Sequence, residues 1–106
     1  MMERDPVLNN IVEKLVSTFQ PDRIYLFGSK ARGEDTVQSD YDLMVIVNSS
    51  TQPSYKRNQL AYQSLKGIGT AVDVLVWTKN AFDSRLHLKA SFPSTIVREG
   101  RLLYAA

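Results

Sequence analysis

The chain has 106 residues, of which 43% are hydrophobic and 23% charged, and its formal net charge is +2. This composition excludes wholesale disorder, and the length suits a single domain over residues 1–106 whose core needs no disulfide or metal. Cysteine is absent and His87 is the one histidine, which excludes a thiolate zinc site, a cysteine nucleophile and a multi-histidine metal centre.

The hydrophobic pattern predicts helices and strands in mixed order. Asp5 and Pro6 mark a helix start, and apolar residues follow at helical spacing as far as Phe19. The α/β (or α+β) class follows, with a small mixed sheet flanked by helices. The expected elements are helices over 6–19, 30–32, 54–66, 79–88 and 92–99, and strands over 23–27, 40–47, 71–77 and 101–104.

Hydropathy and charge point away from membranes and nucleic acid. No apolar run approaches the roughly 18 residues of a membrane span, and the chain starts without the apolar stretch of a signal peptide, so we expect a cytoplasmic protein. The basic residues of the second half are scattered rather than gathered in a stripe. We therefore expect solvated helix faces and no direct binding of nucleic acid.

Two aspartates stand at the start of the expected strand over 40–47. Side chains alternate between the two faces of a strand, so Asp40 and Asp42 project from the same face. Carboxylates this close repel each other unless one is protonated or a cation lies between them. Oxygen ligands without imidazole or thiolate favour Mg²⁺, or Mn²⁺, over zinc. Taken alone, the pair also fits a solvated loop-to-strand junction.

Gly28 and Ser29 lie where an expected strand meets a short helix. We expect Ser29 to cap this helix, whose N-terminus offers unpaired N–H groups and a positive dipole end to an anion. Glycine lets the backbone approach a ligand closely, and the serine hydroxyl adds a donor. The pair predicts a phosphate site, which adjoins the two aspartates if the strands are neighbours.

A third acidic residue, Asp73, lies within the valine-rich strand over 71–77. A charge among valines is costly to bury without a partner, so we expect it to join Asp40 and Asp42 around metal. Three carboxylates and two metal ions fit the template for in-line displacement at phosphorus. The competing interpretation is an aspartate at a strand end, paired with a nearby lysine.

The motifs in combination resemble a known family. The segments GSKARG (28–33) and SDYDL (39–43), followed by Asp73 on a later valine-rich strand, resemble the polymerase-beta-type nucleotidyltransferases. In so short a chain they are similar to the minimal nucleotidyltransferase (MNT) subgroup, the MntA-like antitoxins of HEPN/MNT toxin–antitoxin pairs. The resemblance covers nearly the whole chain and implies the polymerase-beta-like nucleotidyltransferase fold.

The resemblance also implies a role for each motif residue. Asp40 and Asp42 would ligate two Mg²⁺ ions, and Asp73 would ligate one of them and help to deprotonate the acceptor hydroxyl. Gly28 and Ser29 would hold the β- and γ-phosphates of the nucleotide. The implied reaction is attack of a hydroxyl on the α-phosphate of a nucleoside triphosphate such as ATP, with release of pyrophosphate.

A partner is implied as well. MNT proteins are often paired with helical HEPN toxins, and some transfer AMP to a tyrosine of the toxin, so a hetero-oligomer with a HEPN-type toxin is expected. Two alternatives stay open: an antitoxin that neutralises by binding alone, and a nucleotidyltransferase that acts on a small-molecule hydroxyl. Arg32 would contact phosphate, although a surface ion pair explains it equally well.

Several aromatic residues outside the motifs are expected to have structural roles. Tyr55 and Tyr62 lie seven residues apart on one helical face, which fits core packing or a partner-facing patch, and we favour the core. The other aromatic residues that we expect in the core are Trp77, Phe82 and Phe92.

Overall fold

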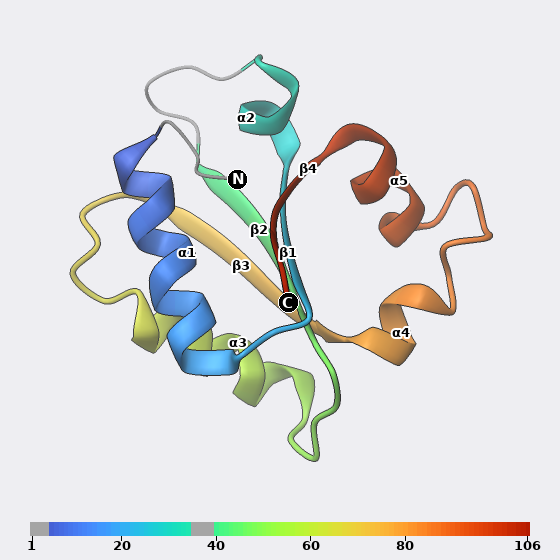
Figure 1. Ribbon diagram of the computed structural model, residues 1–106, viewed down its shortest axis with the longest axis horizontal. Helices are drawn as coiled ribbons and strands as arrows, with labels where there is room; N and C mark the ends of the chain where they lie inside the picture. Colours follow the sequence, from blue (N-terminus) through green and yellow to red (C-terminus); the bar gives the residue numbers. More distant parts are fainter. Residues whose placement is uncertain (1–4, 35–39) are drawn as a thin grey trace.

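The computed structural model describes residues 5–34 and 40–106, so Ser39 of the second motif lies outside the described residues. All the expected helices and strands are present (Figure 1), although the strand expected from 40 begins at Tyr41 and the helix expected over 79–88 ends at Asp83. The elements are α1 (Pro6–Phe19), β1 (Arg23–Phe27), α2 (Gly28–Arg32), β2 (Tyr41–Val47), α3 (Ser54–Ser64), β3 (Val72–Thr78), α4 (Lys79–Asp83), α5 (Phe92–Glu99) and β4 (Arg101–Ala105).

The four strands form one mixed sheet in the order β3-β2-β1-β4, which confirms the expected fold class. β1 runs antiparallel to both β2 and β4, whereas β2 and β3 are parallel. β2 is therefore paired on both sides, and β3 forms one outer edge of the sheet. Its central position explains why β2 is buried without interruption from Leu43 to Val47.

Helices cover both faces of this sheet (Figure 1). α1 and α3 lie on one face, α4 and α5 lie on the other, and α2 stands at one end. Alternate residues of β2 enter two separate hydrophobic clusters. The side facing α1 and α3 receives Tyr41, Leu43, Val45 and Val47, and the other side receives Met44 and Ile46, which pack with Phe82 and Ile96.

The start of α1 is fixed to the start of β2 through one carboxylate. Asp5 accepts hydrogen bonds from the backbone N–H groups of Val7 and Leu8, at 3.0 and 3.2 Å, and Pro6 occupies the first turn. The hydroxyl of Tyr41 donates to the other oxygen of Asp5. Burial alone would raise the pKa of Asp5, but these hydrogen bonds, helped by the charge of Lys30, hold it below its usual value.

The expectation for the aromatic residues is only partly correct. Phe82 is fully buried, but Tyr55 and Tyr62 are 65% and 49% exposed, so their assignment to the core is wrong. The core-facing positions of α3 are instead Ala61 and the following Leu65, one helical turn apart. The other corrected residue is Phe92, which is 38% exposed although its ring contacts those of Phe27 and Trp77.

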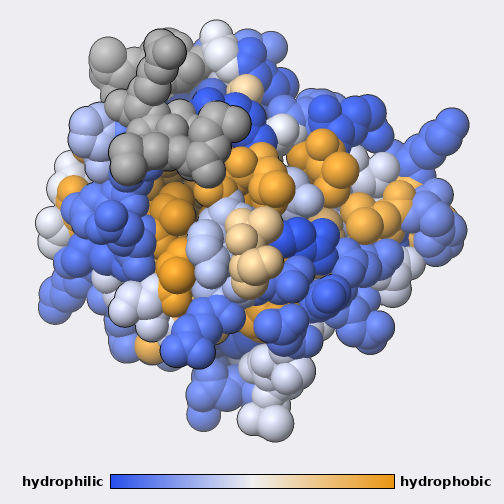
Figure 2. Space-filling view, viewed as in Figure 1, coloured by the Kyte–Doolittle hydropathy of each residue, from blue (hydrophilic) through white to orange (hydrophobic). Residues whose placement is uncertain are grey.

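One face of the molecule shows how its apolar residues are distributed. On the face shown in Figure 2, hydrophilic residues cover most of the surface and divide the hydrophobic ones. Within 5–34 and 40–106, none of the helices combines the length and the apolar character that crossing a bilayer requires.

Candidate active site

The turn between β1 and α2 brings the backbone against Asp42. Gly28 has a φ of +76°, in the left-handed region that favours glycine. A Cβ built at this position would collide with Oδ2 of Asp42 and lie 3.1 Å from its Cγ. Phe27, the residue before the turn, is also the β1 partner of Asp42 in the sheet. Glycine is needed here for both reasons, and the motif predicted to bind phosphate therefore adjoins the aspartate pair.

Asp42 and Asp73 are register partners in the parallel pair of β2 and β3. Partner residues of neighbouring strands face the same side of a sheet, so both carboxylates face the α4/α5 side at the end where these strands begin. Asp40 is exposed, just before β2. Burial raises the pKa of Asp42, and the negative charges of Asp73 and Asp40 raise it further, against the lowering effect of Arg32. The three carboxylates therefore share one electrostatic site.

The chemistry of these donors suits a hard divalent cation. The three groups offer only carboxylate oxygens, as Mg²⁺ and Mn²⁺ prefer. In the part of the chain that the structure describes, no three residues of Asp, Glu, His or Cys are arranged so that they could hold a metal ion by themselves. Mg²⁺ is usually held by one or two carboxylates together with substrate phosphates and water. Carboxylates of this kind therefore fit a cation that substrate phosphates and water also coordinate.

Ser29 differs from the expectation, and Arg32 forms one of the two contacts expected of it. α2 starts at Gly28 and its N-cap position is Phe27, so the prediction that Ser29 caps the helix is wrong. The carbonyl of Ser29 instead accepts the backbone N–H of Glu34, at 3.0 Å. Nε of Arg32 donates to Oε1 of Glu34 at 2.9 Å, which is the surface ion pair considered above. Arg32 also supplies positive charge near Asp42.

Tyr62 reaches this site from the opposite layer, which the sequence had not indicated. It belongs to α3, and its hydroxyl donates to Oδ1 of Asp73 at 3.1 Å. The same helix binds the outer edge of β3 at Val76, whose carbonyl accepts from Nε of Arg57 at 3.1 Å and whose N–H donates to Oδ1 of Asn58 at 2.9 Å. The side chains of α3 therefore lie along this edge, and Tyr62 is the one that reaches a carboxylate of the site.

The environment of Tyr62 keeps its hydroxyl protonated. Burial raises the pKa of Tyr62, a hydrogen bond from the backbone of Val74 lowers it, and the neighbouring Asp73 raises it again, with a net increase. A phenol with a pKa above its usual value is a hydrogen-bond donor at neutral pH. The polar composition of α3, whose single buried residue is Ala61, is the signal that could have directed attention to its tyrosines.

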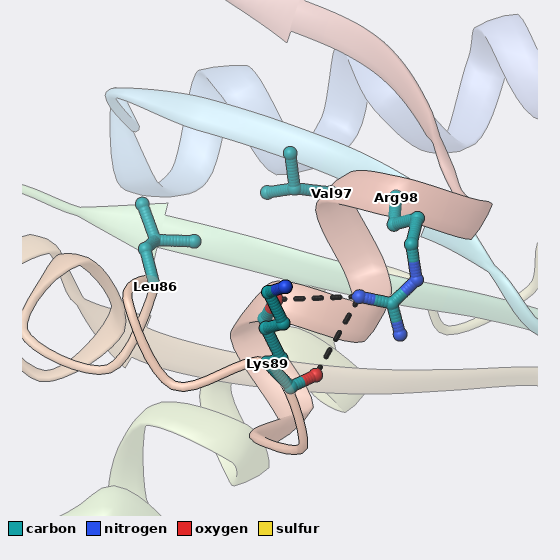
Figure 3. Close-up of a pocket in the computed structure, with 5 residues that line it drawn as sticks. Leu86, Lys89, Val97 and Arg98 are labelled. Atoms are coloured by element: carbon teal, nitrogen blue, oxygen red, sulfur yellow. Dashed lines mark hydrogen bonds between the residues drawn. The ribbon is translucent and has the colours of Figure 1, made fainter.

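The surface also has an open hollow (Figure 3). It measures about 710 Å³ and is lined by residues of α5 and of the segment before it. Arg98 crosses it with hydrogen bonds to the carbonyl of Lys89 and to Oγ of Ser94, at 3.5 and 3.4 Å. None of the predicted site residues lines this hollow.

The mixed sheet, the glycine turn against Asp42 and the register of Asp42 with Asp73 are the features to compare with known proteins. The family model described as Polymerase beta, Nucleotidyltransferase matches residues 9–106. The chain belongs to this family and is an enzyme of the nucleotidyltransferase class.

Individual relatives agree with this assignment. A candidate protein adenylyltransferase of Methanocaldococcus jannaschii, MJ0604, is 28% identical over 105 residues, which are 97% of this chain and 100% of the relative. A candidate nucleotidyltransferase from Sulfolobus solfataricus has the same fold, with a TM-score of 0.67 and 23% identity over 93% of this chain and 78% of that one. A toxin-antitoxin crystallised with AMP-PNP gives a TM-score of 0.65 and 26% identity over 92% of this chain and 73% of that one.

Proposed function

We propose that this chain is a Mg²⁺-dependent adenylyltransferase that transfers AMP from ATP to a hydroxyl group of a partner toxin, and that it thereby acts as the antitoxin. The observation that carries this proposal is the contact of the Gly28 turn with Asp42, directly beside Asp73 in the sheet. Such a contact brings a place for a triphosphate next to carboxylates that can hold the accompanying cation.

Each motif residue has a distinct task in this proposal. Asp40 and Asp42 would hold two Mg²⁺ ions, or Mn²⁺ in their place, together with Asp73. Bound there, the ions would supply positive charge against the phosphates and the leaving pyrophosphate. Gly28 and Ser29 hold the β- and γ-phosphates through the turn that they form.

The acceptor is activated by Asp73. Its carboxylate takes the proton of the attacking hydroxyl, whose oxygen then bonds to the α-phosphorus while pyrophosphate leaves. Arg32 contributes positive charge near Asp42 and contacts phosphate once its ion pair with Glu34 opens. The opening costs little because both side chains are exposed and solvent screens such pairs.

A protein acceptor is favoured by the relatives. The archaeal relative is named for protein adenylylation, and one similar solved structure is a toxin-antitoxin with AMP-PNP. A helical HEPN-type toxin that offers a tyrosine hydroxyl, bound to this chain as a hetero-oligomer, is the partner that we propose.

The test is transfer of label to the protein encoded beside this chain. With Mg²⁺ present, label from α-labelled ATP is expected on that protein and label from γ-labelled ATP is not. Asp42→Asn should abolish the transfer, whereas Glu13→Gln, which removes an exposed carboxylate of α1, should leave it unchanged. Equal transfer by Asp42→Asn would refute the metal assignment.

A second function, neutralisation of the toxin by binding alone, is favoured by one observation. Oδ1 of Asp73, the proposed base, already accepts a hydrogen bond from the hydroxyl of Tyr62. In that case Asp42→Asn would still protect cells from the toxin. Protection that is lost together with label transfer would exclude this alternative.

A further inference from the structure

The hydroxyl of Tyr62 meets the geometric requirement for an acceptor. An attacking hydroxyl must lie within hydrogen-bond reach of the base that takes its proton, at roughly 2.6–3.2 Å. The Tyr62 hydroxyl donates to Oδ1 of Asp73 at 3.1 Å. The side chain is also 49% exposed, so an AMP group attached to it has access to solvent.

We propose that Tyr62 is a self-modification site, to which the chain transfers AMP from ATP. The inference rests on the proposed function, because it uses the same nucleotide, cation and base. It adds an acceptor that belongs to this chain and needs no partner. Tyr62 would be modified within its own molecule, because the base that it contacts is only eleven residues away on the adjacent strand.

The step balances without any further reactant. The phenolic oxygen of Tyr62 forms a bond to the α-phosphorus of ATP, and the bond from that phosphorus to the oxygen bridging to the β-phosphate breaks. Pyrophosphate leaves with the electron pair of the broken bond. The phenolic proton passes to the carboxylate of Asp73 and from there to water. The products are the adenylylated chain, pyrophosphate and a proton.

A purely structural role for Tyr62 is the competing explanation. Tyr62 lies along the outer edge of β3. Arg57 and Asn58 of the same helix bind the backbone of β3 at this edge. That role accounts for the position of the ring and predicts no AMP on the hydroxyl. If Tyr62 is instead an acceptor, a toxin that offers a competing hydroxyl should lower the amount of AMP on Tyr62.

The experiment is peptide mapping of the purified full chain after incubation with ATP and Mg²⁺. Trypsin cuts after Arg57 and after Lys66, so Tyr62 leaves in the peptide over 58–66 while Tyr55 leaves in another. The mass of one AMP group is expected on the peptide over 58–66, localised to Tyr62 by fragmentation. The rate per chain should not change on dilution, as expected for a reaction within one molecule.

Matched variants complete the test. Tyr62→Phe keeps the ring and should lose the label, whereas Tyr55→Phe, about 10 Å earlier along the same helix, should keep it. Binding of an ATP analogue with a methylene group between its α- and β-phosphates is measured in parallel by calorimetry with Mg²⁺.

The outcomes separate the two proposals. A wild-type chain that binds the analogue and labels the neighbouring protein, but carries no AMP on Tyr62, overturns the self-modification alone. A chain that neither binds the analogue nor labels any acceptor overturns the proposed function and the self-modification together. AMP on Tyr62 of the wild-type chain supports both, whether or not the Tyr62→Phe variant folds.

Discussion

Two consecutive residues at the start of β2 serve opposite sides of the sheet. Tyr41 faces α1 and donates its hydroxyl to Asp5, a carboxylate that also caps the helix and whose pKa lies below its usual value. Asp42 faces the other way, toward Asp73 and Asp40, and its pKa lies above the usual value. The carboxylate of Asp5 is thus stabilised by hydrogen-bond donors on one side of the sheet, whereas the carboxylate of Asp42 has negatively charged neighbours on the other. The first arrangement supports folding, and the second creates a demand for a cation.

The short helix α2 contributes to both environments. The ammonium of Lys30 lies 4.4 Å from the centre of the Tyr41 ring, and its charge lowers the pKa of Asp5. The guanidinium of Arg32 lowers the pKa of Asp42, but its closest partner is Glu34. One short helix therefore places a cation near each carboxylate, and the cation near Asp42 is also paired with an acidic neighbour.

The largest effect is expected when the negative charge of Asp42, in the proposed site, is removed. Asp42→Asn should reduce AMP transfer by at least about 100-fold, because replacing even the groups that support a metal ligand typically costs 10- to 100-fold. The free energy of unfolding at neutral pH should not fall, since a like charge has been removed. Initial rates with α-labelled ATP and urea unfolding measure the two quantities. A loss of both AMP transfer and stability would contradict the conclusion that the charge of Asp42 opposes folding.

A second substitution fills the space between the turn and Asp42. Gly28→Ala should destabilise the fold by about 2–3 kcal/mol, because a positive φ and a collision are combined. Gly33→Ala is the matched control, since Gly33 also has a positive φ, +72°, but a Cβ there meets nothing within 4 Å. Its expected cost is about 1 kcal/mol. Equal costs in urea unfolding would show that the contact with Asp42 is unimportant.

On the folding side, Asp5→Ala should reduce the free energy of unfolding by about 1 kcal/mol at neutral pH, the usual value of an N-cap. The folded state lowers the pKa of Asp5, so the ionised form supplies stability above the unfolded value of 3.8. That share of the stability is lost as the pH falls through the lower, folded pKa. Thermal unfolding of both proteins from pH 7 to acid should show the difference shrinking.

The smallest expected effect is a pH dependence of stability at Asp42 that is opposite in sign to the one at Asp5. Its folded pKa is raised, so the ionised form opposes folding at neutral pH, and this cost is relieved as the pH falls through the folded pKa. Asp42→Asn should therefore unfold at a slightly higher temperature than the wild type at pH 7. The gain should disappear below the unfolded value of 3.8. A gain in unfolding temperature that grows toward acid pH would contradict the conclusion that ionised Asp42 opposes folding.

The sequence predicts most of the fold but only part of the site. Strong local signals, such as Asp5 before Pro6 and the alternation along β2, suffice to place the elements. The pairing of Asp42 with Asp73 depends on β3 lying beside β2 in parallel register, which no local pattern specifies. The position of Tyr62 depends on β3 being the outer strand and on the rotation of α3, both of which are tertiary properties.

The binding of α3 along β3 also affects how this molecule can associate. An outer strand with unpaired N–H and C=O groups is a template on which another chain can add a strand, and proteins commonly block it. Here the N–H of Val76 already donates to Asn58 and its carbonyl already accepts from Arg57. A second molecule could extend the sheet at β3 only by displacing both side chains. Edge-to-edge aggregation is therefore disfavoured next to the proposed site.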